Sequence, residues 1–107
     1  MVLADTPWIG LDVPDCVAAH EDNLAECAVS REVAFARSAG SIQRDAVARE
    51  SRAHIIDVTD WVCPAEECAP VIGDVLVWRD AHHLTATYAL SLQEMLDDSL
   101  SPIITNR

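Results

Sequence analysis

An aspartate and a histidine three residues apart form the densest chemical signal in the sequence. Asp80 and His83 lie in the string WRDAHHLT (residues 78–85), between a β-rich run and a predicted helix. In a tight turn, the Asp80 carboxylate can accept a hydrogen bond from one imidazole nitrogen of His83. That bond would fix the tautomer and stabilise the imidazolium formed when the other nitrogen takes a proton. The spacing therefore indicates a general base, although a surface aspartate beside a histidine at a helix start would produce the same pattern.

Other side chains compete for a role in such a site. His82 is adjacent to His83, but its offset from Asp80 is two residues rather than three, and we favour His83 as the base. The three tryptophans could form a surface for stacking sugars, or they could fill gaps beneath loops. We expect the second, because large aromatic side chains contribute most when they are buried. The tryptophans are Trp8, Trp61 and Trp78.

Four cysteines form two local pairs, Cys16 with Cys27 and Cys63 with Cys68. An even number at short spacings indicates disulfides, which belong outside the cytosol. Three connectivities are open, and we favour the local pairing because it closes the smallest loops. Free buried thiols are one alternative, and a zinc site that uses Cys16, His20, Cys27 or the Cys63/Cys68 pair is another. Neither pair has the C-x2-C spacing of common zinc sites.

Length and charge exclude several classes of protein. The chain has 107 residues, 50% of them hydrophobic, and a net charge of -11. One small domain with a packed core is expected. The acidity argues against nucleic acid, which requires clustered cationic side chains. No apolar run reaches the roughly 20 residues of a membrane helix, and the N-terminus does not resemble a signal peptide.

The elements that must position the Asp–His pair follow from the hydrophobic pattern. Strands are expected at residues 2–4 and 54–58, and a hairpin or two short strands at 71–78, around a Gly-Asp turn. Ser30 should cap a helix at 31–37, and Ser41 another at 42–52. Residues 6–29 should form a long loop with at most one short helix, and residues 63–70 a turn-rich loop. Thr85 should begin the last helix, which Pro102 ends.

Alternating strands and helices indicate an α/β fold. However, only about three strands are found in 107 residues, whereas doubly wound sheets usually have about five or six. The sheet is therefore expected to be incomplete.

The wider sequence resembles the C-terminal end of the SGNH (GDSL-like) hydrolase superfamily. The closest resemblance is to the SGNH domain fused to bacterial acyltransferase-3 membrane proteins, which O-acylate cell-surface glycans. The resemblance rests on VLADTP (2–7) as a late core strand, the two cysteine loops, and RDAHHLTATYA (79–89) with its Asp-x-x-His block. It implies a three-layer α/β/α, flavodoxin-like sheet, of which residues 1–107 are the C-terminal portion.

The resemblance also implies a mechanism. His83 would activate a serine and Asp80 would orient His83, so that acyl transfer or ester hydrolysis proceeds through an acyl-serine without a metal or organic cofactor. The partners would be an acyl donor, a glycan acceptor and an acyltransferase membrane domain, on the extracytoplasmic side of the bacterial membrane.

The family's Gly-Asp-Ser block is missing from the sequence, because none of the three glycines stands in that pattern. The nucleophile-bearing part is therefore expected to be absent, and the chain alone to be inactive. Two other interpretations remain at this point. The chain could be an exported, disulfide-stapled binding module without catalysis, or a truncated gene remnant.

Overall fold

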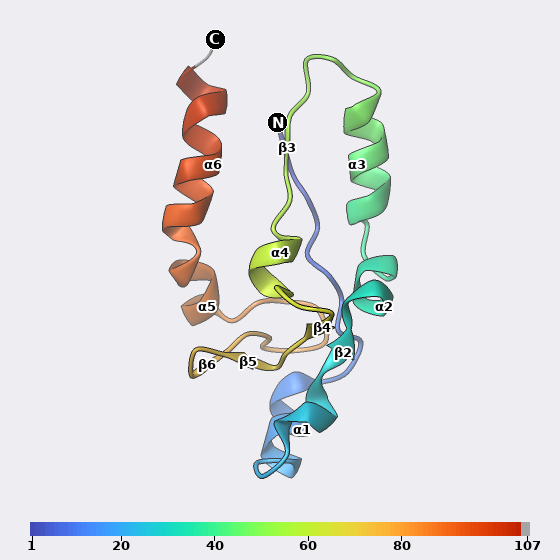
Figure 1. The fold of residues 1–107 in the computed structure, drawn as a ribbon, viewed down its shortest axis with the longest axis vertical. Helices are drawn as coiled ribbons and strands as arrows, with labels where there is room; N and C mark the ends of the chain where they lie inside the picture. The colour runs from blue at the N-terminus through green and yellow to red at the C-terminus, as the bar shows by residue number, and fades with distance from the viewer. Residues whose placement is uncertain (106–107) are drawn as a thin grey trace.

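The computed structural model describes residues 1–105, which form a chain of short elements (Figure 1). Most elements span one or two turns of helix or two residues of strand. In chain order they are β1 (Val2–Leu3), α1 (Val13–Ala19), the 3-10 helix η1 (Leu24–Cys27), β2 (Val29–Ser30), α2 (Arg31–Ala36), α3 (Gly40–Ala48), β3 (Ile55–Ile56), α4 (Thr59–Val62), β4 (Glu67–Cys68), β5 (Val71–Ile72), β6 (Val75–Leu76), α5 (Ala86–Ser91) and α6 (Gln93–Thr105).

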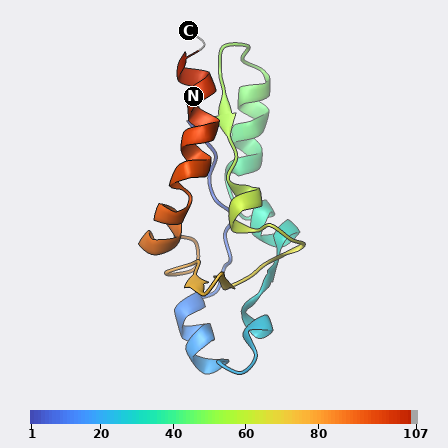
Figure 2. The same ribbon diagram turned by 60° about the vertical axis from the view of Figure 1, so that its left-hand side comes forward.

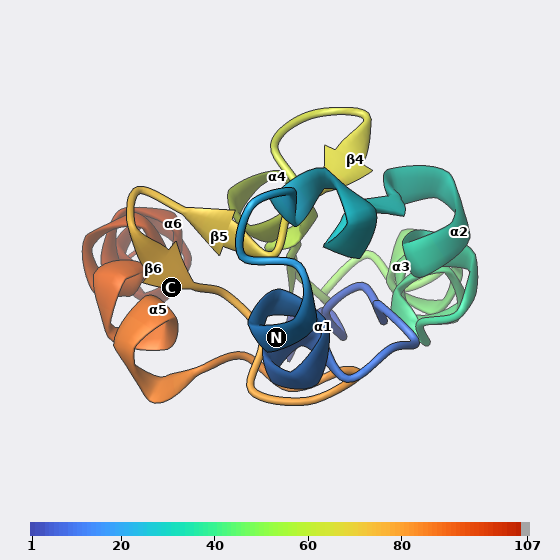
Figure 3. The ribbon, with the colours of Figure 1, turned by 90° about the horizontal axis from the view of Figure 1, so that it is seen from below.

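The strands β1 and β3 form a parallel pair that lies between α3 and α6. Val2 is in register with Ile55, and Leu3 with Ile56. Figures 1 and 2 show β3 running between α6 and α3. Seen from below, α5 and α6 lie at one side of the molecule and α2 and α3 at the other (Figure 3). Parallel strands joined through helices confirm the α/β class expected from the sequence.

Two further strand pairs are antiparallel. β5 and β6 form the expected hairpin, and both turn residues, Gly73 and Asp74, have positive φ angles of 55° and 64°. Two positive φ angles are the requirement of a type I′ turn, which matches the twist of the flanking strands. β2 pairs with β4, and this pairing was not predicted, since residues 63–70 had been expected to form only turns.

The hydrophobic core lies at one end of an elongated molecule. The chain measures 50 × 26 × 19 Å, with a radius of gyration of 15.0 Å, where a compact domain of this size would have about 13 Å. In the core, side chains from α1, α2, α4 and α5 pack against the segment after β6. The fully buried members of the core are Ile9, Val13, Ala34, Val62, Cys63, Cys68, Val77 and Trp78. Burial of these apolar side chains is what holds the loops of this end together.

The other end is thinly packed. No residue of α6 is buried, and its Met95 and Ile104 are exposed, as are Leu3 of β1 and Ile42 of α3. A helix with an apolar stripe normally buries that stripe against a neighbour. Within residues 1–105, no helix combines the length and hydrophobicity needed to cross a membrane.

Two of the three helix caps predicted from the sequence are confirmed. Ser30 caps α2 and Thr85 caps α5, each accepting a backbone N–H from three residues on. The prediction that Ser41 caps the next helix was wrong, because α3 already begins at Gly40. Other side chains accept the N–H groups at the start of α3: the N–H of Ala39 donates to the Asp5 carboxylate, and that of Gly40 donates to the Ser38 hydroxyl.

The last helix and the first loop also differ from expectation. The helix is broken at Leu92 and then continues through Pro102 to Thr105. A proline there removes only one hydrogen bond, and the carbonyl left unpaired lies on an exposed turn where water can reach it. Residues 6–29 contain two helices rather than at most one: α1, which Asp12 caps by accepting from the N–H of Asp15, and the 3-10 helix η1.

Candidate active site

The loop between β6 and α5 folds back on itself and presents Asp80 and His83 at its tip. Trp78 and Leu84 form an isolated antiparallel bridge, and the N–H of Arg79 donates to the carbonyl of His83 at 2.9 Å. The Trp78 side chain is fully buried in the core. Burial of this large side chain anchors the base of the loop in the core.

Asp80 and His83 are hydrogen-bonded as the sequence predicted. Asp80 Oδ2 lies 2.7 Å from His83 Nδ1. The second carboxylate oxygen, Oδ1, accepts the backbone N–H groups of His82 at 2.9 Å and His83 at 2.7 Å. The carboxylate therefore closes the turn and orients the imidazole at the same time.

These hydrogen bonds keep Asp80 ionised. The backbone N–H of His82, and then the backbone and ring N–H groups of His83, hold the pKa of Asp80 well below its usual range, although partial desolvation acts in the opposite direction. An ionised carboxylate can only accept hydrogen bonds, so Nδ1 of His83 carries the proton. In a neutral imidazole with this tautomer, the lone pair of Nε2 is free, as a general base requires.

The imidazole is open to a reactant. The side chains of Asp80 and His83 are 38% and 51% exposed. Within residues 1–105, no serine hydroxyl forms a hydrogen bond with His83. The chain thus holds a histidine oriented by a carboxylate, whereas a nucleophile beside them is not found in the part that the structure describes.

A distant segment of the chain supports the loop tip. The N–H of Gly10 donates to the carbonyl of Ala81 at 2.9 Å, and the ring of Trp8 lies 4.9 Å from that of His82. Gly10 has a φ of +81°, which favours glycine. Sequence reasoning missed these supports, because the two segments are far apart in the chain and no local pattern connects them.

The tryptophans differ in their environments. Trp78 fills the core, as expected, and Trp61 is partly buried against it. Trp8 is 39% exposed beside His82, and this departs from the expectation that all three would fill gaps. Its chain neighbours Pro7 and Ile9 are the residues that turn inward. Trp8 therefore forms part of the surface next to the Asp–His pair.

Both expected disulfides are present. Cys16 is bonded to Cys27, and Cys63 to Cys68. This finding confirms the pairing that closes the smallest loops. It also removes the zinc alternative, because a sulfur in a disulfide is not a thiolate ligand, and the nearby His20 Nδ1 instead lies 2.9 Å from the carbonyl of Cys16.

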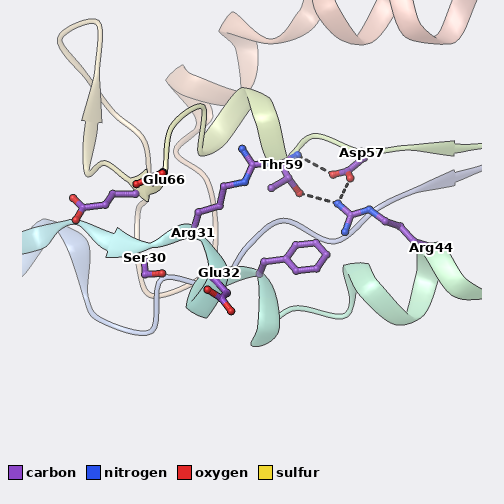
Figure 4. Close-up of a pocket in the computed structure, with 9 residues that line it drawn as sticks. Ser30, Arg31, Glu32, Arg44, Asp57, Thr59 and Glu66 are labelled. Carbon is purple, nitrogen blue, oxygen red and sulfur yellow. Dashed lines mark hydrogen bonds and ion pairs between the residues drawn. The ribbon is translucent and has the colours of Figure 1, made fainter.

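A pocket of about 880 Å³ lies apart from the Asp–His pair, between β2, α2 and the start of α4 (Figure 4). Arg44 in this pocket pairs with Asp57 and donates to Thr59 at 3.2 Å. Arg31 pairs with Asp60 and donates to the carbonyl of Cys63. Both guanidinium groups are already neutralised by neighbours, so they stabilise the fold around the pocket rather than present a free cationic site.

A family model described as "SGNH domain (fused to AT3 domains)" matches residues 1–98. The chain belongs to this SGNH family. The match includes the β6–α5 loop with Asp80 and His83, as well as both disulfides. It confirms the resemblance drawn from the sequence and agrees with the α/β class. The family is one in which the SGNH domain is joined to AT3, or acyltransferase-3, domains. Comparisons with curated proteins and with solved structures gave no match.

Proposed function

We propose that this SGNH chain supplies the histidine–aspartate pair of an O-acyltransferase or esterase that acts on cell-envelope glycans. The observation that carries the proposal is the bond between Asp80 Oδ2 and His83 Nδ1, which leaves Nε2 free at an exposed loop tip. The serine would come from a segment outside the 107 residues, since the sequence contains no Gly-Asp-Ser block.

The chemistry follows from the tautomer of His83. Nε2 would take the proton from the serine hydroxyl as the oxygen attacks the acyl carbonyl, and the imidazolium would then be stabilised by the Asp80 carboxylate. The same Nε2–H would protonate the departing alkoxide and leave an acyl-serine. A glycan hydroxyl or water, deprotonated by Nε2 in its turn, would release the acyl group. No step requires a metal or an organic cofactor.

The arrangement of the elements supports the wider assignment. α3 and α6 flank the β1–β3 pair, as expected of a three-layer α/β/α sheet. β1 pairs only with β3 among residues 1–105, and one edge of β1 therefore stays available for further strands. Two disulfides favour the extracytoplasmic side of the membrane, and the AT3 fusion of the family favours a membrane acyltransferase as the partner domain.

Complementation with a serine-bearing segment would test the proposal. The chain is fused behind the Gly-Asp-Ser segment of another SGNH domain of this family, and hydrolysis of p-nitrophenyl acetate is measured. We expect turnover from the fusion and none from the 107-residue chain. His83→Ala should lower the turnover about 10²–10⁴-fold, the usual contribution of a general base.

His54→Ala is the matched control, because His54 is exposed and lies outside the loop. It should leave the rate unchanged. Equal turnover in the fusion and its His83→Ala variant would contradict the assignment of the base. A folded fusion that stays inactive would contradict the proposed function and favour a binding module.

A further inference from the structure

A second imidazole makes the loop tip a cluster of three metal-ligating side chains. Asp80, His82 and His83 each offer one ligand atom, and these atoms all lie within 4.8 Å of one another. Asp80 Oδ1 is 3.9 Å from His82 Nδ1, and Asp80 Oδ2 is 2.7 Å from His83 Nδ1. All three side chains are partly exposed, so an ion can reach them from solvent.

The separations are close to those that one ion requires. Zinc binds imidazole nitrogen and carboxylate oxygen at about 2.0–2.2 Å, so two of its ligands lie no more than about 4 Å apart. The Asp80–His82 pair already meets this limit. The backbone bonds at Ala81 and His83 hold the tip. Small rotations of the side chains, without movement of the backbone, would therefore bring the three ligands onto one ion.

We propose that Asp80, His82 and His83 bind a divalent transition metal, zinc in the first instance, and that the ion switches the Asp–His pair off. Open positions on the ion would be filled by water, as is common in exposed sites with three protein ligands.

Zinc binding would stop His83 from acting as a base because the two roles require different protonation of its ring nitrogens. As a base, His83 carries a proton on Nδ1, donates it to Asp80 and keeps the lone pair of Nε2 free. Bound through Nδ1, the imidazole must place its lone pair on the metal and its proton on Nε2. The two states require opposite tautomers, so the same imidazole cannot serve both. Only this regulatory consequence rests on the proposed function; the binding site itself does not.

Zinc binding to the disulfide-bonded 107-residue chain tests the proposal directly. Calorimetry with zinc chloride should show one ion per chain. In ¹⁵N NMR spectra of the imidazoles, zinc should shift the Nδ1 signals of His82 and His83. His82→Ala removes one of the three protein ligands and should lower the affinity by at least about tenfold, the smaller loss expected when only a group that orients a ligand is removed. His54→Ala, the same change outside the cluster, should leave the affinity unchanged.

A circular dichroism spectrum identical to that of the parent chain should accompany His82→Ala, and His82→Gln provides a second variant with a side chain nearer in size. No heat of binding at millimolar zinc would overturn the proposal, as would binding that both His82 variants retain. Zinc bound with the His83 tautomer unchanged would overturn the switch. These outcomes require no esterase activity, so they are separate from a failure of the proposed function.

Discussion

Replacing Asp80 by asparagine should reverse the tautomer of His83. In the structure, Asp80 Oδ1 accepts two backbone N–H groups, from His82 and His83, and Oδ2 accepts one ring N–H. An asparagine has one oxygen, which should stay at the Oδ1 position because an amide NH₂ there would face two donors. The NH₂ group is then placed at the Oδ2 position, opposite Nδ1 of His83.

Two donors cannot face each other at this distance, so Nδ1 of His83 would have to accept. Its proton would move to Nε2, and the atom that should act as the base would lose its lone pair. Two of the three hydrogen bonds are unchanged and the third is reversed, so we expect the loop to keep its fold. In a serine-complemented protein, the rate should fall about 10⁴-fold, the effect of the wrong tautomer in a Ser-His-Asp triad.

The assay is the ¹⁵N spectrum of the His83 imidazole in the 107-residue chain. The protonated nitrogen should be Nδ1 in the parent chain and Nε2 in the Asp80→Asn variant. Asp97→Asn on α6 is the matched control, since Asp97 is exposed and far from the loop in the chain. An Asp80→Asn variant that keeps its proton on Nδ1 would refute the reasoning, because the orientation of the base would not then depend on the carboxylate.

Three further predictions concern stability, measured by urea unfolding. Replacing both cysteines of one disulfide by alanine should lower the free energy of unfolding through loop entropy alone. The loss should be about 2.8 kcal/mol for Cys16–Cys27, with a sequence separation of 11, and about 2 kcal/mol for Cys63–Cys68, with a separation of 5. Variants as stable as the parent chain would contradict this. Tyr88→Phe should cost roughly 1–2 kcal/mol, because it leaves the carbonyl of Trp61 without the hydroxyl that donates to it; an unchanged urea midpoint would show that water replaces the hydroxyl. Folding lowers the pKa of Asp80. The contribution of the Asp80 carboxylate to the free energy of unfolding is therefore complete above about pH 4, and it is lost as the pH falls through the lower pKa of the folded chain. The parent chain should therefore lose stability more steeply than Asp80→Asn below about pH 4, and parallel curves would argue against a stabilised carboxylate.

Features that depend on neighbouring residues could be predicted from the sequence. The Asp-x-x-His turn, the Gly73-Asp74 hairpin and the two disulfides each join residues no more than 11 positions apart. Local spacing largely fixes their geometry, because a short loop has few conformations that bring its ends together.

Features that join distant segments could not be predicted. The start of α3 is decided by Asp5, which takes the N–H of Ala39 from another part of the chain. The pairing of β2 with β4 and the support of His82 by Trp8 are similar cases. A single sequence carries no signal for such contacts, because they depend on how the core brings the segments together.

The thin end of the molecule has a consequence for its dynamics. β1 and β3 are two residues each, come from distant parts of the chain, and are joined by few hydrogen bonds beside a helix with no buried residue. Segments of this kind open at the lowest free energy, while a packed and cross-linked core opens last. Amide hydrogen exchange should therefore be fast at Val2 and Ala4 and slow around Val77 and Trp78. The loop that carries Asp80 and His83 should thus belong to the slowly exchanging part of the molecule, and the β1–β3 pair to the part that opens first.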